Sequence, residues 1–336
     1  MMENDKIVVW GAGAWGTALA IHLASSGRKV SLWVFEKEQF DTMKVKRENV
    51  DFLPGFHLPD ELNLFHDPES VPQGAHVWMA VAPTQATRLL WSRIGKLCPK
   101  EALVISASKG IERETLLPVS SVLEEYLPAE CAPVVALSGP SFAKGLAGGD
   151  PTAVVLASSD PERVARAQRI VSSPPLRAYT GSDRIGVELG GAVKNVIAIS
   201  CGIAAGLGFG PNTVAALITR GLREIVRLGE AMGADGWTFY GLSGVGDLTL
   251  TCTDAQSRNR TVGFRLGRGE SLDEILASVK TVAEGVETTR SVADLARSYN
   301  VEMPITFTVE RILYEGLTPS EALDELLKRR LKSEMD

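Results

Sequence analysis

The sequence predicts an α/β part with a mostly parallel sheet, followed by an all-α part. Up to about residue 180, short β-prone runs alternate with segments of helical composition, which is typical of a parallel sheet with helices on both faces. From about residue 183 this alternation stops and long helical patterns follow one another. A chain of 336 residues is long enough for two domains, and we place them at residues 1–185 and 186–336.

A glycine-rich turn follows the first β-prone run. It has the spacing G-x-G-x-x-G at Gly11, Gly13 and Gly16, with Ala14 and Trp15 between the last two glycines. Such glycines allow a tight turn, let the backbone approach a diphosphate and let the next helix pack closely, while the helix N-terminus faces the phosphates. The pattern predicts a Rossmann-like domain that binds NAD or NADP. A glycine turn in another kind of α/β protein is the alternative.

The end of the second β-prone run bears on which dinucleotide binds. Phe35 and Glu36 stand where a 2′-phosphate on the adenine ribose would be paired with a cation. We expect Phe35 to pack on the adenine and Glu36 to accept from the ribose hydroxyl groups, which favours NAD over NADP. The alternative is that Phe35 belongs to the core and Glu36 begins an exposed turn. The nearby Lys37, Lys46 and Arg47 leave the use of NADP open.

Lys109 follows one of the later β-prone runs and precedes Gly110. Ligands of parallel sheets bind beyond the carboxyl ends of the strands, so Lys109 is expected to project from the ligand edge. An exposed loop lysine is the alternative. The expected strands are residues 6–10, 29–35, 76–83, 102–110, 132–140 and 152–159, and the expected helices are 16–26, 84–97, 115–127 and 160–172.

Lys194 and Asn195 stand inside the apolar stretch "LGGAVKNVIAIS" at residues 189–200. A helix over residues 183–200 would have no broad polar face, so we expect it to be internal. A buried ammonium group needs a carboxylate, a ligand or trapped water as its partner. The two glycines one turn before Lys194 would let a ligand approach, which favours a ligand site over a purely structural ion pair. The other expected helices are 213–232, 271–279, 284–299, 304–315 and 318–331.

The segment at residues 240–263 supplies candidate partners. Asp247 follows a glycine run and precedes apolar residues, and Thr251 would share its face if this piece is helical. A hydroxyl, a planar guanidinium and an amide then follow one another, a set of donors that suits an oxyanion. These donors belong to Ser257, Arg258 and Asn259, for which an exposed loop is the alternative.

Charge and cysteine content restrict the class of protein. The net charge is −6, from 35 basic and 41 acidic residues, which disfavours a general affinity for nucleic acid or anionic membranes. Four scattered cysteines suggest no metal site and fit a reducing compartment. The N-terminus does not read as a signal peptide and no apolar run approaches a membrane span, so we expect a cytoplasmic protein.

Seven motifs, in this order and at these separations, resemble the NAD(P)-dependent glycerol-3-phosphate dehydrogenases, which interconvert dihydroxyacetone phosphate and sn-glycerol 3-phosphate. They are "GAGAWGTALA" at 11–20, "LPG" at 53–55, "SKGIE" at 108–112, "LSGPSFA" at 137–143, "GGAVKNVIAI" at 190–199, "GVGDLTLTCTDAQSRNR" at 244–260 and "AEGVETT" at 283–289. The resemblance implies a fold like that of 6-phosphogluconate dehydrogenase, NAD or NADP as cofactor and a homodimer. It also implies a supply of glycerol 3-phosphate for phospholipid synthesis.

The resemblance further implies roles for single residues, with Lys194 as the proton acceptor. The expected catalytic residues are Lys194, Lys109, Asn195, Asp247 and Thr251. The expected substrate contacts are Lys109, Gly139, Ser141, Lys194, Asp247, Ser257, Arg258 and Asn259. The expected cofactor contacts are Gly11, Gly13, Ala14, Trp15, Gly16, Phe35, Glu36, Lys109, Ala143, Arg258, Val282 and Glu284. Burial and Lys109 would lower the pKa of Lys194 whereas Asp247 would raise it, and the sequence leaves the balance open.

Two other functions fit parts of the pattern. A dehydrogenase of the same two-domain build, acting on a 3-hydroxy acid or a phosphogluconate, also places a lysine–asparagine pair on the helix after the nucleotide domain. A non-catalytic dinucleotide-binding sensor would keep the glycine loop, but it would not need Lys109, Lys194 and Asp247 together. The resemblance also has a departure, because many bacterial members have arginine where this chain has Phe35.

Overall fold

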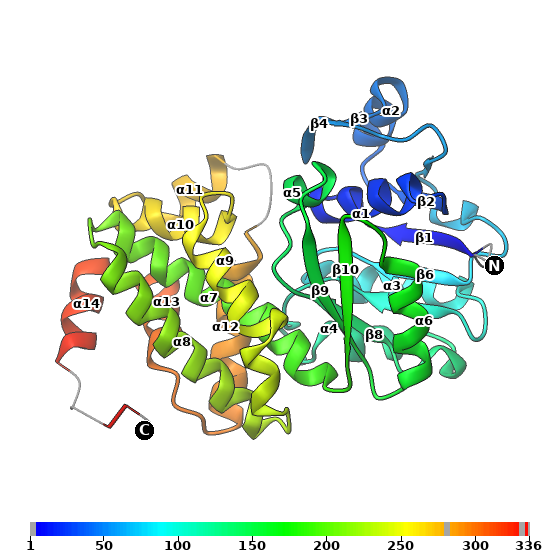
Figure 1. The fold of residues 1–336 in the computed structure, drawn as a ribbon. Coiled ribbons are helices and arrows are strands. Elements are labelled where there is room, and N and C mark those ends of the chain that lie inside the picture. The colour runs from blue at the N-terminus through cyan, green and yellow to red at the C-terminus, as the bar shows by residue number, and fades with distance from the viewer. Residues whose placement is uncertain (1–4, 279–282, 329–332, 335–336) are drawn as a thin grey trace.

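The computed structural model describes residues 5–278, 283–328 and 333–334, and the first part of the chain forms an eight-stranded sheet (Figure 1). The strand order is β10-β9-β8-β7-β6-β1-β2-β5, and the described pairs are parallel except for β8 with β9. The mostly parallel sheet expected from the sequence is therefore confirmed. The strands are β1 (Lys6–Trp10), β2 (Lys29–Trp33), β5 (Asn63–Phe65), β6 (Val77–Ala80), β7 (Leu103–Ser106), β8 (Val135–Ser138), β9 (Thr152–Ala157) and β10 (Leu176–Gly181).

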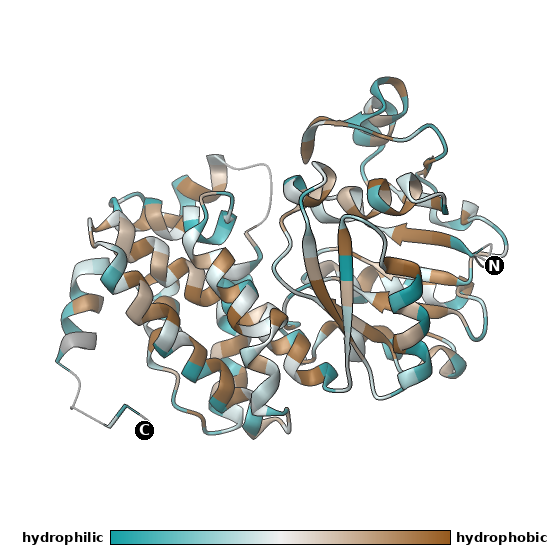
Figure 2. Cartoon of the chain, in the orientation of Figure 1, coloured by the Kyte–Doolittle hydropathy of each residue, from teal (hydrophilic) through white to brown (hydrophobic). Residues whose placement is uncertain are grey.

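Side-chain alternation along β1 builds a separate core on each face of the sheet. Ile7 and Val9 belong to a cluster that includes residues of the helices α1 and α6, whereas Val8 and Trp10 belong to a cluster with residues of α3 and α4. In Figure 2 the strand β1 is largely brown, as a strand buried on both faces should be. The helices of this part are α1 (Ala14–Ser25), α2 (Lys37–Lys46), α3 (Thr87–Ile94), α4 (Val119–Glu124), α5 (Ala143–Ala147) and α6 (Pro161–Val171).

The second part of the chain is helical and is built around α7 (Arg184–Gly206). Of its 23 residues, nearly all are buried, and residues of α8, α9, α10 and α12 pack against it. The remaining helices are α8 (Pro211–Ala231), α9 (Asp247–Thr253), α10 (Arg258–Gly267), α11 (Leu272–Ser278), α12 (Glu284–Ser298), α13 (Pro304–Tyr314) and α14 (Pro319–Leu327), with a 3₁₀ turn η5 (Gly236–Tyr240) and a π turn η6 (Leu242–Gly246) before α9.

By length and composition α7 alone among the helices of the described residues could cross a membrane. Its apolar window is 94% buried inside the protein, so the helix serves as the core of the helical part. The helix is more apolar than expected from the sequence, where no apolar run was expected to approach a membrane span. The internal position expected for it is what the structure shows.

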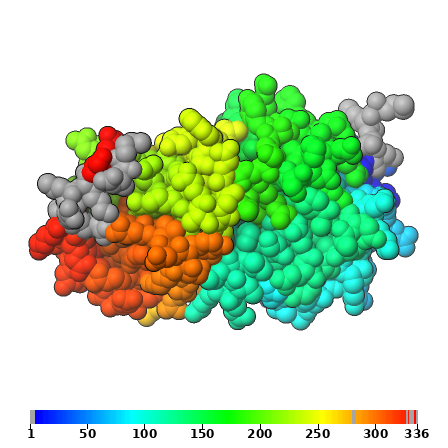
Figure 3. Space-filling view, turned by 90° about the horizontal axis from the view of Figure 1, so that it is seen from below, coloured from blue at the N-terminus to red at the C-terminus, as the bar shows by residue number. Residues whose placement is uncertain are grey.

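The two parts meet along a broad junction that is visible in the middle of Figure 3. On α7, the Glu188 carboxylate accepts hydrogen bonds from the backbone N–H of Ser120 (2.9 Å) and from its hydroxyl (2.5 Å). Arg184, one turn before Glu188 on α7, forms an ion pair with Glu124 of α4. The first turns of α7 are therefore anchored on α4, which fixes where the rest of α7 lies relative to the sheet.

Some predicted elements differ from those observed. The helix expected at 115–127 is shorter, because Leu116 has a positive φ of 59° and Pro118 precedes the first helical residue. Both edge strands, β10 and β5, the helices α2 and α5, and the hairpin of β3 (Glu48–Asn49) with β4 (Leu53–His57) were missed. The helix expected at 183–200 extends to Gly206, and the segment after residue 246 contains two helices, α9 and α10.

Candidate active site

Three charged side chains from distant parts of the chain meet at the junction. Lys194 of α7 donates from Nζ to Asp247 Oδ1 at 2.5 Å and to Thr251 Oγ1 at 2.9 Å. Lys109, in the loop after β7, donates to the other Asp247 oxygen at 2.7 Å and to the Gly139 carbonyl at 3.1 Å. The structure thus brings together four of the predicted catalytic residues, with one carboxylate between two ammonium groups.

Burial determines the ionisation of this cluster. Burial lowers the pKa of Lys194 to about 8; the ammonium group of Lys109 acts in the same direction, and Asp247 opposes both. Burial alone would raise the pKa of Asp247, but the two lysines hold it below its usual value. The sequence left open whether the pKa of Lys194 is raised or lowered. In the structure it is lowered, so the neutral amine is accessible near neutral pH.

Thr251 belongs to this cluster, whereas Asn195, the residue after Lys194 on α7, makes its side-chain contact elsewhere. Thr251 Oγ1 donates to the Asp247 carbonyl at 2.6 Å, one helical turn away on α9, so the shared face predicted for these residues is confirmed. Asn195 is buried, and its amide nitrogen lies 3.5 Å from the Gly191 carbonyl of its own helix. Its side chain is thus held only weakly by the protein.

The glycines before Lys194 have a different use from the one expected. A Cβ on Gly190 would lie 2.5 Å from the Ser243 carbonyl oxygen, and one on Gly191 would lie 2.7 Å from Ser138 Oγ. Protein groups fill these positions, so the expectation that the two glycines leave room for a ligand is wrong. They instead allow η6 and β8 to pack directly on α7.

The glycine-rich turn after β1 has the shape that a dinucleotide requires. Gly11 has a φ of 129°, and a Cβ there would lie 2.8 Å from the Val81 carbonyl oxygen. A Cβ on Gly16 would lie 1.9 Å from the Gly11 carbonyl oxygen, whereas nothing lies within 4 Å of the Cβ position of Gly13. Together with the N-terminus of α1, which no side chain caps, this open position fits the diphosphate of NAD(P). Ala14 and Trp15 form the first turn of that helix.

Other predicted cofactor contacts lie at the same edge of the sheet. Phe35 follows β2 and is 64% exposed, with its ring 5.6 Å from that of Trp33. Glu36 is exposed at the N-terminus of α2. Both side chains are therefore open to a ligand, and Phe35 is not part of the core. Ala143 begins α5, beside the loop after β8.

The loop after β8 carries two predicted substrate contacts. Gly139 has a φ of 139°, and a Cβ there would lie 2.9 Å from the backbone of Val154. Its carbonyl oxygen accepts hydrogen bonds from Lys109 and from the Ser141 hydroxyl at 2.9 Å. This loop therefore helps to hold Lys109 toward Asp247.

The predicted oxyanion donors form the first turn of α10. Ser257 caps this helix through a hydrogen bond from the Arg260 N–H at 3.2 Å, and Arg258 is exposed. Asn259 is buried, and its Oδ1 accepts from the Gly285 N–H at 3.0 Å at the start of α12. Two of the three donors thus also have structural hydrogen bonds. Within the part of the chain that the structure describes, no hydrogen bond or ion pair withholds the Arg258 guanidinium from a ligand.

Glu284 lies at the N-terminus of α12. Its carboxylate accepts a long hydrogen bond, 3.4 Å, from the backbone N–H of Thr84 in the loop after β6. Burial raises the pKa of Glu284, and the charge of Arg258 opposes this. The remaining predicted cofactor contact, Val282, lies outside the described residues.

Residues that no sequence pattern indicated support the glycine-rich turn. Asn49 is fully buried, and its amide donates to the Ala12 carbonyl at 2.9 Å and to Thr17 Oγ1 at 2.8 Å. Gln39 donates to the same carbonyl at 2.8 Å. An asparagine shortly before the "LPG" motif was the available signal, but a lone amide in a loop predicts no particular contact.

Comparison with known proteins assigns the chain. Residues 6–164 match the family described as "NAD-dependent glycerol-3-phosphate dehydrogenase N-terminus", and residues 183–324 match the corresponding C-terminus. The chain belongs to the glycerol-3-phosphate dehydrogenase family. It is an oxidoreductase that depends on NAD(P) and acts on a small phosphorylated substrate.

Individual relatives of this glycerol-3-phosphate dehydrogenase agree with the assignment. A glycerol-3-phosphate dehydrogenase [NAD(P)+] of Citrifermentans bemidjiense is 49% identical over 331 residues, which is 98% of this chain and 99% of that protein. The crystal structure of the Coxiella burnetii enzyme superimposes with a TM-score of 0.93 at 39% identity, over 97% of this chain and 99% of that one. A ketopantoate reductase of Ralstonia eutropha shares the fold, with a TM-score of 0.60 at 15% identity over 95% and 99%.

Proposed function

We propose that Lys194 is the proton acceptor when this dehydrogenase oxidises glycerol 3-phosphate, and the proton donor when it reduces dihydroxyacetone phosphate. The observation that carries this proposal is the buried contact of Lys194 with Asp247, supported by Thr251. A lysine with a pKa of about 8 can be neutral or charged near physiological pH, which both directions require. When bound, NAD(P) supplies the hydride acceptor or donor.

Each member of the cluster has a separate task in this proposal. Lys194 Nζ takes the proton of the substrate C2 hydroxyl, and Asp247 fixes the direction of that amine. Lys109 keeps a positive charge beside the substrate oxygen and stabilises the alkoxide as it forms. Asn195, whose amide is weakly held by the protein, orients a substrate hydroxyl group. Gly139 and Ser141 lie on the substrate side of Lys109.

The substrate phosphate binds at the N-terminus of α10, between Ser257, Arg258 and Asn259. A helix N-terminus with a free guanidinium suits a phosphate dianion. Because the phosphate takes no part in the reaction, its binding energy serves to hold C2 in position. Arg258 and Glu284 would also contact the cofactor, and they lie near enough to each other for the charge of Arg258 to act on the Glu284 carboxylate.

The dinucleotide loop, from Gly11 to Gly16, holds the diphosphate in this proposal, with Phe35 and Glu36 at the adenosine end. We propose NAD as the preferred cofactor. Lys37 is paired with Asp41 at 2.5 Å, and the Arg47 guanidinium donates to backbone carbonyl groups, including that of Leu62 at 3.0 Å. Arg47 is thereby withheld from a 2′-phosphate, whereas the Lys37 pair is exposed and weak and Lys46 is exposed. The preference for NAD therefore rests on Phe35 and Glu36, which stand after β2 where a 2′-phosphate would need a cation. Values of kcat/KM for NADH and NADPH test this, and a higher value with NADPH would contradict it.

We also propose a cytoplasmic homodimer with domains at residues 1–185 and 186–336, and a role in supplying glycerol 3-phosphate for phospholipid synthesis. The dimer and the metabolic role follow from the family resemblance, the domain bounds from the end of the strand–helix alternation, and the location from the sequence pattern. Sedimentation of the purified protein tests the dimer. The reaction itself is tested by absorbance at 340 nm. Dihydroxyacetone phosphate should be reduced with NADH, whereas a 3-hydroxy acid or phosphogluconate should give no turnover in the oxidising direction.

A further inference from the structure

The loop that carries Lys109 is held from one side by a short segment of the chain. This loop, residues 108–115, is called the Lys109 loop below, and it connects β7 to α4. At its start, the Ser108 hydroxyl donates to the Ala82 carbonyl at 2.6 Å. A Cβ on Gly110 would lie 2.5 Å from Thr84 Oγ1, so the loop runs directly against the segment after β6.

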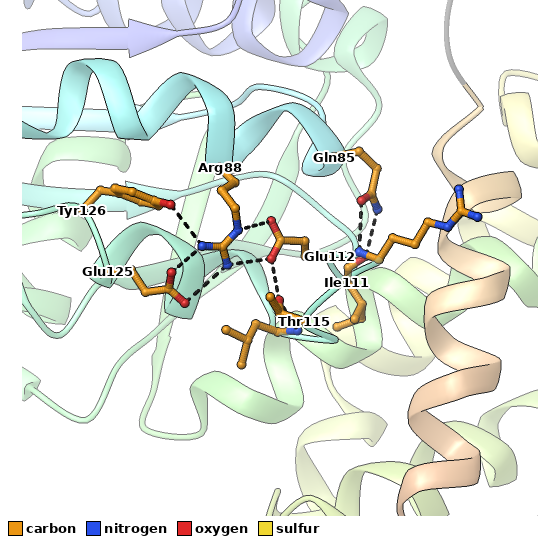
Figure 4. A network of polar contacts seen from close by, with 9 residues as sticks. Gln85, Arg88, Ile111, Glu112, Thr115, Glu125 and Tyr126 are labelled. Atoms are coloured by element: carbon orange, nitrogen blue, oxygen red, sulfur yellow. Dashed lines mark hydrogen bonds and ion pairs between the residues drawn. The ribbon is translucent and has the colours of Figure 1, made fainter.

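Gln85 binds the Lys109 loop with both ends of its amide. Its Nε2 donates to the Ile111 carbonyl at 3.0 Å, and its Oε1 accepts from the Arg113 N–H at 3.1 Å. Figure 4 shows this side chain reaching across to the backbone at Ile111. One amide thus fixes two backbone groups that lie two and four residues after Lys109, and the opposite orientation of the amide would satisfy neither.

Arg88 holds the residue between those two backbone groups. Its guanidinium binds both oxygens of Glu112, with Nε to Oε1 at 2.8 Å and Nη2 to Oε2 at 2.7 Å, and also donates to Tyr126 Oη at 3.1 Å (Figure 4). Thr115 donates to the same carboxylate at 2.5 Å. Burial opposes ionisation of Glu112, but the bonds from Arg88 and Thr115 hold its pKa below the usual value, so the pair stays charged.

The same segment also contacts the helical part. Thr84, next to Gln85, donates from its backbone N–H to Glu284 of α12. Arg113 of the Lys109 loop lies 3.7 Å from Glu287 on the same helix. Gln85 therefore stands between the start of α12 and the loop that delivers Lys109 to Asp247.

We propose that Gln85 is a positioning residue for Lys109. It acts through the backbone of the Lys109 loop, because both ends of its amide are bound to that backbone. A lysine side chain has four rotatable bonds. The position of its ammonium group therefore depends both on how firmly its backbone is held and on what the ammonium group binds. This inference rests on the role proposed above for Lys109, because a fixed loop matters for turnover only if Lys109 acts on the reacting oxygen.

The test compares Gln85→Ala with Gln168→Ala, which loses a similar hydrogen bond from an amide to a backbone carbonyl, that of Ala178 at 2.9 Å, remote from Lys109. Because Gln85 is exposed, its truncation should leave the protein folded. Misplacement of Lys109 should lower kcat by roughly tenfold and change the KM for dihydroxyacetone phosphate much less. Gln168→Ala should leave kcat within about twofold of the wild type.

A double-mutant cycle separates a positioning role from a general structural one. If Gln85 acts through Lys109, then Gln85→Ala should change kcat by less than about twofold in a Lys109→Ala background. An equal loss of kcat in both backgrounds, or a wild-type kcat for Gln85→Ala alone, would overturn the inference. A wild-type kcat for Lys109→Ala alone would instead remove the proposed role of Lys109, and this inference with it.

Discussion

Asp247 and Lys194 lie 53 positions apart in the chain, and their Oδ1 and Nζ atoms are 2.5 Å apart in a buried site. Asp247 binds Lys109 through its other oxygen at 2.7 Å. One carboxylate between two ammonium groups leaves the cluster with an excess positive charge when both lysines are protonated. An anionic substrate and a developing alkoxide are therefore favoured at this position, and loss of one proton from Lys194 is made easier.

Removal of the Lys194 amine should abolish most of the turnover. Lys194→Ala is expected to lower kcat by roughly 10²–10⁴-fold, the usual contribution of a positioned acid or base. Lys194→Arg serves as the second variant, because arginine keeps the charge but does not release a proton at neutral pH. Binding of NADH, followed by its fluorescence, should be nearly unchanged in both. A kcat close to wild type in either variant would exclude Lys194 as the proton acceptor.

The pH dependence should have opposite signs in the two directions. Oxidation of glycerol 3-phosphate needs neutral Lys194, so its kcat/KM should rise with pH through about 8, the pKa of this lysine. Reduction of dihydroxyacetone phosphate needs the ammonium form, and its rate should fall through the same range. Asp247→Asn removes a group that raises this pKa, so the midpoint of both profiles should move to lower pH. Unmoved midpoints would show that another group controls the profiles.

Loss of the Arg258 guanidinium should affect binding of the phosphorylated substrate more than the chemical step. Arg258→Ala should raise the KM for dihydroxyacetone phosphate by roughly 10–100-fold, since a charge-assisted hydrogen bond contributes about 1.5–3 kcal/mol. Initial rates over a range of substrate concentrations give this value. Unphosphorylated dihydroxyacetone is the control substrate, and the wild-type enzyme should use it very poorly. Equal use of the two ketones by the wild type would contradict a phosphate anchor.

The sequence predicted those parts of the site that follow from a local rule. The glycine spacing predicted the turn at Gly11. The buried ammonium of Lys194 required a carboxylate, a ligand or trapped water as its partner, and Asp247 was the candidate carboxylate. The pKa of Lys194 was not predictable, because burial, Lys109 and Asp247 act in opposite directions and only distances decide between them. The role of Gln85 was not predictable either, since a glutamine at the start of an expected helix has no pattern that reveals which backbone groups it binds.

The differences between the predicted and the observed fold also arise where a local pattern is too weak to decide. The edge strand β10 alternates buried and exposed residues and contains arginine and threonine, so it lacks the continuous apolar run of the central strands. Gly190 and Gly191 looked like space for a ligand, but the Ser243 carbonyl and Ser138 occupy it. A glycine in a helix predicts a close approach without telling whether protein or ligand approaches.

The buried amide of Asn49 should matter for cofactor binding, because it ties the Ala12 carbonyl of the glycine-rich turn to Thr17 on α1. In Asn49→Ala the carbonyl keeps its hydrogen bond from Gln39, so the turn should loosen without being lost. We expect the dissociation constant of NADH to rise about fivefold, which corresponds to ~1 kcal/mol for one hydrogen bond. Calorimetric titration with NADH measures this change.

A matched control for Asn49→Ala is Asn63→Ala on the edge strand β5. The Asn63 amide donates to the Ser31 hydroxyl at 3.3 Å, away from the turn, so its removal should leave NADH binding unchanged. Both variants are expected to lower the melting temperature, Asn49→Ala by more, because the buried Asn49 side chain makes four hydrogen bonds whereas Asn63→Ala loses the bond to Ser31. If Asn49→Ala lowered the melting temperature while NADH bound with wild-type affinity, then Asn49 would stabilise the fold alone and the turn would be held in shape by its glycines and by Gln39.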